Sequence, residues 1–103
     1  MIEIHFPTPE GGRQRIKITG HSGEDRKGND VVCAAVSSLL LTMVGGLEIE
    51  AQAVICGSLK DGFCDVEIEV PNDRKVNFYS ILKVFRYGFK RLSETYPEYV
   101  IMN

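Results

Sequence analysis

The sequence predicts an α+β fold, a two-layer sandwich in which two helices cover a mainly antiparallel sheet. Segments with strand-like alternation come in neighbouring pairs, which is typical of hairpins and therefore of antiparallel pairing. Each pair is followed by a segment of helical periodicity, so the order is β-β-α-β-β-α. The 103 residues are enough for one domain over 1–103 and leave no room for a second.

The first hairpin is predicted at the start of the chain. Apolar and polar residues alternate over 2–6, which indicates a half-buried strand. A loop rich in proline and glycine follows over 7–12, and a second alternating strand runs over 13–18. The outer face of that second strand is basic and carries Arg13, Arg15 and Lys17.

A polar connection and a helix come next. Residues 20–30 are rich in glycine and charge and offer almost nothing to a core, so they are predicted to form a loop of the kind that often carries function. Asp30 is expected to be the helix N-cap. Apolar pairs recurring every three to four residues predict a helix over 31–44, and Gly45-Gly46 is expected to end it.

The second hairpin is predicted from a short apolar segment over 51–57, a turn over 60–62 and a cleanly alternating segment over 63–70. Asn72 or Asp73 is then expected to cap a second helix. That helix is predicted from one continuous apolar stripe: Phe78, Leu82, Phe85, Phe89, Leu92 and Tyr96.

Two features near the end of the chain complete the predicted fold. Gly88 lies inside the second helix, where it costs about 1 kcal/mol relative to alanine, and we expect it to allow a close approach of another element. Val100 and Ile101 are predicted to add a short strand. The aromatic stripe of the second helix is most simply core, although its length also suits a dimer interface.

The composition excludes several classes of protein. A net charge of −2 with 44% hydrophobic residues argues against a disordered chain and against binding of nucleic acid by bulk charge. The apolar runs are shorter than the roughly 20 residues of a membrane span, and no signal peptide is recognised. We therefore expect a cytoplasmic protein with reduced thiols and no membrane partner.

The cysteines and histidines do not have the spacing of a metal site. The three cysteines and two histidines lack any C-x-x-C pair, so no metal is predicted. Cys56 and Cys64 flank the turn of the second hairpin and are expected to be buried strand residues. His5 is expected to be solvated on the polar face of the first strand.

One constellation has the residue types of nucleophilic catalysis. With Asp30 as the N-cap, Cys33 is the third helical residue, where unpaired amides and the helix dipole favour a thiolate. The amides near Val32 to Ala34 are candidates for holding an oxyanion. His21, at the end of the second strand, is the candidate base of a Cys–His pair.

Two neighbours are candidates for supporting this pair. Asp30 could orient His21, and Ser37 lies one helical turn beyond Cys33, where it could hydrogen bond near the sulfur. Plainer interpretations remain open at every position. Cysteine is often a buried small hydrophobe, His21 can be a surface loop histidine, Asp30 only a cap, and Ser37 only a tolerated helix serine.

The region of this pair resembles a known family. Gly20-His21-Ser22-Gly23, followed by Gly-Asn-Asp-Val-Val-Cys-Ala-Ala-Val-Ser over 28–37, is similar to the signature of the bacterial ribosomal-processing cysteine proteases (Prp, also called the YsxB-like family). The element order, the Gly-Leu-Glu over 46–48 and the Tyr-Pro-Glu-Tyr over 96–99 also resemble this family. The resemblance therefore covers nearly the whole chain.

The resemblance implies a function and its partners. Members are small cytoplasmic homodimers that need no cofactor. They remove a short N-terminal extension from a protein of the large ribosomal subunit, after a hydrophobic stretch that contains phenylalanine. The nucleophile corresponds to Cys33, the base to His21 and the motif aspartate to Asp30. The loop over 22–29 is expected to close over the substrate.

The substrate loop departs from the family at Ser22, where the family often has alanine, and at Glu24. Its candidate residues are Gly20, Ser22, Gly23, Glu24 and Gly28. Glu24 stands where the family commonly has an aromatic residue, which bears on substrate preference. Two alternatives stay open. The same pair could process a different protein, such as a phage structural protein, or the chain could be a non-catalytic module that binds the ribosome or RNA through its basic strand face.

Overall fold

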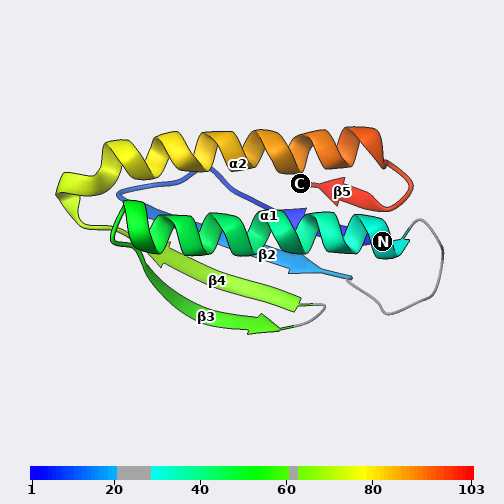
Figure 1. Cartoon of the computed structure of the whole chain (residues 1–103), viewed down its shortest axis with the longest axis horizontal. Helices are drawn as coiled ribbons and strands as arrows, with labels where there is room; N and C mark the ends of the chain where they lie inside the picture. Colours follow the sequence, from blue (N-terminus) through cyan, green and yellow to red (C-terminus); the bar gives the residue numbers. More distant parts are fainter. Residues whose placement is uncertain (21–28, 61–62) are drawn as a thin grey trace.

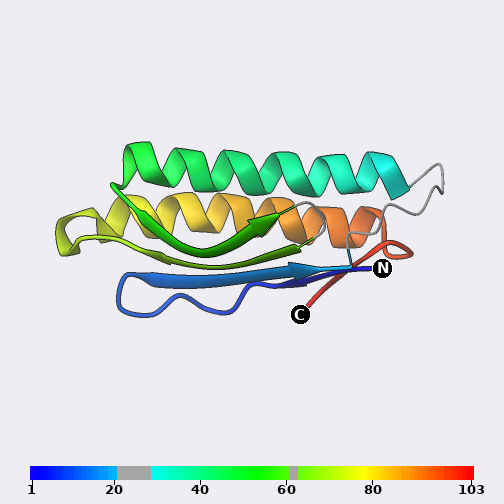
Figure 2. The ribbon, with the colours of Figure 1, turned by 90° about the horizontal axis from the view of Figure 1, so that it is seen from below.

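The computed structural model describes residues 1–20, 29–60 and 63–103, with the backbone alone at residues 29 and 30. Within these residues, five strands form one sheet and two helices lie together on one of its faces, which confirms the predicted α+β sandwich (Figure 1, Figure 2). The elements are β1 (Ile2–His5), β2 (Arg13–Thr19), α1 (Asn29–Glu50), β3 (Val54–Lys60), β4 (Phe63–Glu69), a 3-10 turn η1 (Asn72–Arg74), α2 (Lys75–Thr95) and β5 (Val100–Met102).

The sheet has the strand order β3-β4-β2-β1-β5. Neighbouring strands are antiparallel except β1 and β5, which are parallel. Because side chains alternate along a strand, the register places apolar residues on the helix side and charged residues on the open face. Ile16 of β2 lies opposite Val66 of β4 in the core, whereas Arg15 lies opposite Glu67 on the open face.

The core lies between the sheet and the two helices. Phe6 from the end of β1, Met43 and Leu47 from α1 are among its largest fully buried side chains. Burial of a side chain of this size stabilises the fold by about 1.5–3 kcal/mol. The predicted stripe of α2 is confirmed, with Phe78, Leu82 and Phe89 buried and Phe85, Leu92 and Tyr96 half-buried against the core.

The two helices approach closely where Gly88 of α2 faces Leu39 of α1. A Cβ atom added at Gly88 would lie 3.3 Å from Leu39 Cδ1, which is tighter than an ordinary van der Waals contact. The absence of a side chain at this position therefore makes room for the leucine. This confirms the expected close approach at Gly88.

The loop between β1 and β2 is fastened to α2. The Arg86 guanidinium donates hydrogen bonds to the carbonyls of Phe6 and Pro7, at 2.8 and 2.7 Å, and lies 4.5 Å from the centroid of the Phe6 ring. The Tyr79 hydroxyl accepts a hydrogen bond of 2.9 Å from the Gly12 amide. These contacts fix the loop at the end of the molecule opposite the start of α1 (Figure 1).

The first helix is longer than predicted. The sequence analysis ended it at Gly45-Gly46, but α1 continues to Glu50. Leu47 is fully buried just beyond the glycines, and its burial outweighs the roughly 1 kcal/mol that each glycine costs inside a helix. The chain leaves the helix at Gln52, which has a left-handed φ of 52°, and the Leu47 carbonyl accepts the Ala53 amide at 3.1 Å.

Two other predicted boundaries are wrong. Strand β3 occupies Val54–Lys60 rather than 51–57, because α1 takes up the chain as far as residue 50. No side chain caps α2, so the predicted caps at Asn72 and Asp73 are not formed. Both residues belong instead to the 3-10 turn η1, in which a backbone hydrogen bond closes the turn before α2 begins.

Helix α1 also has the length and composition of a membrane-crossing helix over Val31–Glu50, and 39% of its most apolar part is buried inside the molecule. The sequence analysis missed this because serines and glycines interrupt the leucine runs without introducing any charge. Core helices of soluble proteins can have the same length and composition. One face of α1 packs against the rest of the molecule, and its opposite face is outermost (Figure 2).

Candidate active site

Cys33 is positioned by the buried face of α1. Cys33 is 7% exposed and belongs to the hydrophobic core together with Val32 and Val36 of the same helix. It therefore combines a packed position with a place near the helix start, where the dipole stabilises negative charge. Ser37, one turn further along α1, is half-buried.

The start of α1 differs from the prediction by two residues. The helix begins at Asn29, so Asp30 lies in the first turn instead of preceding it, and Cys33 is the fifth helical residue rather than the third. The helix dipole favours an acidic residue in the first turn, and an acidic residue is also favoured at the N-cap. The sequence alone therefore does not show which of these two positions Asp30 occupies.

This shift moves the unpaired amides of the helix. In an α-helix each N–H bonds to the carbonyl four residues earlier, so the amides of Cys33 and Ala34 pair with the carbonyls of residues 29 and 30. The unpaired amides of the described helix therefore fall at residues 29–31. The unpaired amides at residues 29–31 therefore replace the predicted oxyanion donors near Val32 to Ala34.

The chain reaches this end of the molecule through Gly20, the residue after β2. Gly20 has a φ of +81°, and a Cβ atom there would overlap the Met1 carbonyl oxygen. Only glycine suits this conformation and this contact. The end of β2 and the start of α1 lie at the same end of the molecule in both views (Figure 1, Figure 2). The alternation of apolar and polar residues in the sequence did not predict the contact between Gly20 and Met1.

The other predicted residues of the site lie outside the part of the chain that the structure describes. They are the base His21 and the loop residues Ser22, Gly23, Glu24 and Gly28. The Asp30 side chain is also outside it. Their roles remain predictions.

The two remaining cysteines are not equivalent. Cys64 is buried, and its Sγ donates to the Ile16 carbonyl at 3.9 Å. Burial, and secondarily the charge of Asp65, raises the pKa of the Cys64 thiol to about 11, so it is a poor nucleophile near neutral pH. Cys56 is exposed, against the prediction, because β3 is an edge strand.

The register also separates these two cysteines. Cys56 lies opposite Glu67, and Cys64 lies opposite Leu59, so they do not face each other across the hairpin. Among the described side chains, no group of three or more His, Cys, Asp or Glu is arranged to hold a metal ion.

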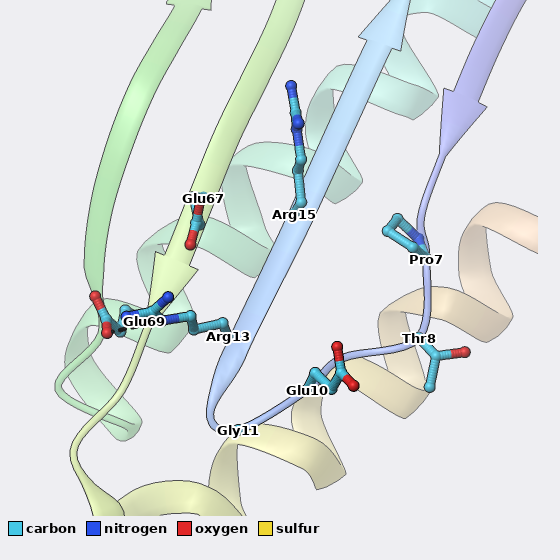
Figure 3. Close-up of a pocket in the computed structure, with 8 residues that line it drawn as sticks. All are labelled: Pro7, Thr8, Glu10, Gly11, Arg13, Arg15, Glu67 and Glu69. Atoms are coloured by element: carbon cyan, nitrogen blue, oxygen red, sulfur yellow. Dashed lines mark hydrogen bonds and ion pairs between the residues drawn. The ribbon is translucent and has the colours of Figure 1, made fainter.

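The open face of the sheet carries the basic residues that suggested RNA binding. There Arg13 forms an ion pair of 3.0 Å with Glu69, and Arg15 one of 3.2 Å with Asp65. Figure 3 shows Arg13 and Glu69 side by side. Both residues line a hollow of about 650 Å³ on this face. The acidic residues of β4 offset the basic strand, so this face does not form the uncompensated basic patch that nucleic acid requires.

A cysteine near a helix start has the position of a potential nucleophile. The comparisons with known proteins identify the class of protein. The family model of cysteine protease Prp matches residues 1–101. The chain therefore belongs to the Prp family of cysteine proteases.

Solved structures have the same fold. SMU.848 from Streptococcus mutans is 30% identical, with a TM-score of 0.83 over 100% of this chain and 92% of that chain. The ribosomal processing protease Prp from S. aureus, in complex with a substrate peptide, is 20% identical with a TM-score of 0.76, over 100% of this chain and 98% of that one. The same protease with a covalently linked product peptide is 21% identical with a TM-score of 0.74, over the same shares. No curated protein matches the chain.

Proposed function

We propose that this chain is a cytoplasmic, homodimeric cysteine endopeptidase, a single domain over 1–103, that removes the N-terminal extension of a large-subunit ribosomal protein. Cys33 is the nucleophile and His21 the base. The observation that carries the proposal is the position of Cys33 near the start of α1 in a chain of the Prp family. The S. aureus relative bound to a substrate peptide supports a peptide substrate.

The chemistry begins with the Cys33 thiol. His21 accepts the thiol proton, and the sulfur attacks the scissile carbonyl carbon. The carbonyl oxygen becomes an oxyanion, for which the unpaired amides at residues 29–31 are the nearest helical donors. When the oxyanion collapses, the C–N bond breaks and His21 gives its proton to the leaving amine.

A thioester between Cys33 and the N-terminal fragment remains. A water molecule attacks its carbonyl carbon while His21 accepts a proton from the water. The C–S bond then breaks, and the proton on His21 returns to the sulfur. The carboxylic acid product leaves, and the enzyme is restored without a cofactor.

The remaining site residues have supporting roles in this proposal. Asp30, in the first turn of α1, orients His21, and Ser37 supports the sulfur from the next turn. The loop that contains Ser22, Gly23, Glu24 and Gly28 closes over the peptide, starting from Gly20. Glu24 adds a negative charge to this loop and disfavours acidic residues in the peptide.

A peptide-cleavage assay tests the proposal. A peptide copying the N-terminal extension of the organism's own ribosomal protein is incubated with the enzyme and examined by mass spectrometry. We expect one cut in the wild type and no detectable cut in Cys33→Ala or His21→Ala. Cys56→Ala is the matched control, since Cys56 is exposed and far along the chain from the site, and it should cleave normally.

Four results would contradict the proposal or part of it. An intact peptide with the wild-type enzyme would refute the substrate, and cleavage of a phage protein instead would assign the same chemistry to another target. Cleavage that survives Cys33→Ala would refute the nucleophile. Salt-dependent RNA binding without any proteolysis would favour the non-catalytic alternative.

A further inference from the structure

The charge of α2 is almost entirely of one sign. From Lys75 to Ser93 the helix contains no Asp or Glu, although the whole chain has a net charge of −2. Within the described part of the chain, no carboxylate forms an ion pair with its basic residues, and the ion pairs described above lie on the open face, on the other side of the sheet. These unpaired basic residues are Lys75, Lys83, Arg86, Lys90 and Arg91.

Three of these cations lie along one side of α2 and are here called the α2 basic stripe. Lys83, Arg86 and Lys90 are spaced by three and four residues, so they follow one another along the same side of the helix. At a rise of about 1.5 Å per residue they extend over about 10 Å. Gly88, where α1 packs against α2, lies on the opposite side, so α1 does not cover the stripe.

Arg86, in the middle of the stripe, is fixed in position but has no counter-charge among the described residues. Its Nη1 and Nη2 atoms donate to the neutral carbonyls of Phe6 and Pro7. Burial of part of the guanidinium lowers the pKa of Arg86 from its ordinary value. A partly buried cation is costly to desolvate and is usually paired with an anion. A bound anionic group would compensate the charge that the described chain leaves uncompensated.

A hollow of about 540 Å³ lies beside the stripe, between α2 and the loop that joins β1 to β2. Its apolar walls are formed by Pro9, Tyr79 and Leu82. The charged residues that line it are Lys83 and Arg86, both positive. Apolar walls with a few polar groups at defined positions are typical of sites that take a small organic group. The combination suits a flat, largely apolar group that carries a negative charge next to it.

The Tyr79 ring is a rigid wall of this hollow. Its hydroxyl accepts the Gly12 amide at 2.9 Å, and its ring centroid lies 5.5 Å from that of Phe78. A ring that is already fixed loses little conformational freedom when a ligand stacks on it. Aromatic side chains are the surfaces on which unpaired nucleobases stack.

Other anionic partners fit this part of α2 less well. A membrane surface requires the apolar face of an amphipathic helix, and in α2 that face is buried in the core. An acidic protein segment would compensate the cations but would leave the Tyr79 wall and the 62% exposed ring of Tyr87 unused. A single RNA strand uses both features, because its phosphates alternate with bases that stack on aromatic rings.

We propose that the α2 basic stripe and the adjacent hollow bind single-stranded RNA. Phosphates of the strand contact the three cations of the stripe, and one unpaired base enters the hollow and stacks on Tyr79. The binding is local, so it does not depend on the charge of the whole chain. The hollow lies apart from Cys33, because the β1–β2 loop that borders it is at the end of the molecule opposite the start of α1 (Figure 1).

An RNA site on α2 has a consequence for the protease. Because the proposed substrate is a protein of the ribosome, RNA bound on α2 would hold the enzyme close to that substrate. This consequence rests on the proposed function, whereas the RNA site itself rests only on the charge and shape of α2 and its neighbouring loop.

Fluorescence anisotropy with a labelled, unstructured RNA of about 12 nucleotides tests the proposal. In about 50 mM NaCl we expect a dissociation constant below about 10⁻⁴ M for the wild type. Contacts of three cations with phosphates predict a slope of about −2 for the logarithm of the association constant against the logarithm of the salt concentration. The affinity should therefore fall roughly 20-fold when the salt is raised to about 200 mM.

Substitutions on α2 should weaken this binding. Lys83→Gln removes one phosphate contact, so we expect about fivefold weaker binding and a slope that is shallower by about 0.7. Tyr79→Leu should weaken binding about tenfold, whereas Tyr79→Phe keeps the stacking surface and should bind nearly as well as the wild type. Lys17→Gln is the matched control, because it removes the same charge on the open face of the sheet and should leave the affinity unchanged. Circular dichroism checks that every variant is folded.

Each other result overturns the proposal in a defined way. A wild type that does not bind the RNA in low salt refutes the site, and a Lys17→Gln variant weakened as much as Lys83→Gln refutes its place on α2. An oligoglutamate of the same length that competes as well as the RNA assigns the stripe to acidic protein segments. Adenosine monophosphate that binds as tightly as the RNA assigns the hollow to a free nucleotide. The peptide-cleavage assay, run on the same variants without RNA, reports separately on the catalytic proposal.

Discussion

Gly20 shows how much a single residue constrains this fold. Its φ of +81° is in the left-handed region, and its Cα lies against the Met1 carbonyl. Both the backbone conformation and the contact exclude a side chain. The residue therefore sets the direction in which the chain leaves β2, immediately before the proposed base His21.

We expect Gly20→Ala to destabilise the protein by roughly 2–4 kcal/mol, because strain in the left-handed region adds to a steric overlap with backbone that cannot move aside. The measurement is urea unfolding. Gly11→Ala is the matched control, since Gly11 has a φ of +58° with nothing within 4 Å of an added Cβ atom. It should cost about 1 kcal/mol. Equal losses in both variants would show that the contact with Met1 contributes nothing.

At the scale of single elements, α1 illustrates a competition between local propensity and burial. Glycine pairs usually end helices, yet α1 passes through Gly45-Gly46 because Leu47 is fully buried beyond them. The two glycines therefore lower the stability of the helix but do not end it. Gly88 in α2 is the opposite case, because Leu39 of α1 occupies the space where its side chain would be.

Substitution of these glycines by alanine should separate the two cases. Gly46→Ala should stabilise the monomer by about 0.5–1 kcal/mol, because alanine loses less backbone entropy in a helix and an added Cβ atom meets nothing within 4 Å. Gly88→Ala should give no such gain, because its Cβ atom would lie 3.3 Å from Leu39 Cδ1. Thermal unfolding at low protein concentration measures both without a contribution from dimerisation. A Gly46→Ala variant less stable than the wild type would contradict this account.

On the scale of the whole molecule, much of the fold could be predicted from the sequence. Alternation over 2–6, 13–18 and 63–70 identified three strands and their buried faces. In a half-buried sheet, apolar residues at every second position all lie on the buried face. The apolar stripe of α2 was equally informative. Segments without a periodic signal, such as the start of β3, were misplaced, because their positions depend on where α1 ends.

The candidate site was predictable in part. Motif and helix periodicity together placed Cys33 near the start of a helix, and the structure moves it by only two positions. Exposure was harder to predict. Cys56 and Cys64 look alike in sequence, but Cys56 is in an edge strand and Cys64 in an interior strand. Strand order is a property of the assembled sheet, and local patterns do not encode it.

Burial of Cys64 also makes a prediction for the whole molecule. Its pKa in the folded protein is about 11, against an ordinary value of 9.0. Above pH 9 the unfolded chain loses the thiol proton while the folded protein keeps it, so the free energy of unfolding should fall as the pH rises through this window. Urea unfolding between pH 8 and pH 11 measures this slope, and Cys64→Ala should make it shallower. An unchanged slope in the variant would show that other groups cause it.

The parallel pairing of β1 with β5 has a consequence for the order in which the protein is made. The Ile2 amide bonds to the Tyr99 carbonyl at 2.7 Å, and the Asn103 amide bonds to the Ile4 carbonyl at 2.8 Å. Strand β1 is therefore synthesised well before β5, the strand that pairs its outer edge. Until residue 102 has left the exit tunnel, the nascent chain has an open β1 edge, and chaperones would affect the yield most at this step.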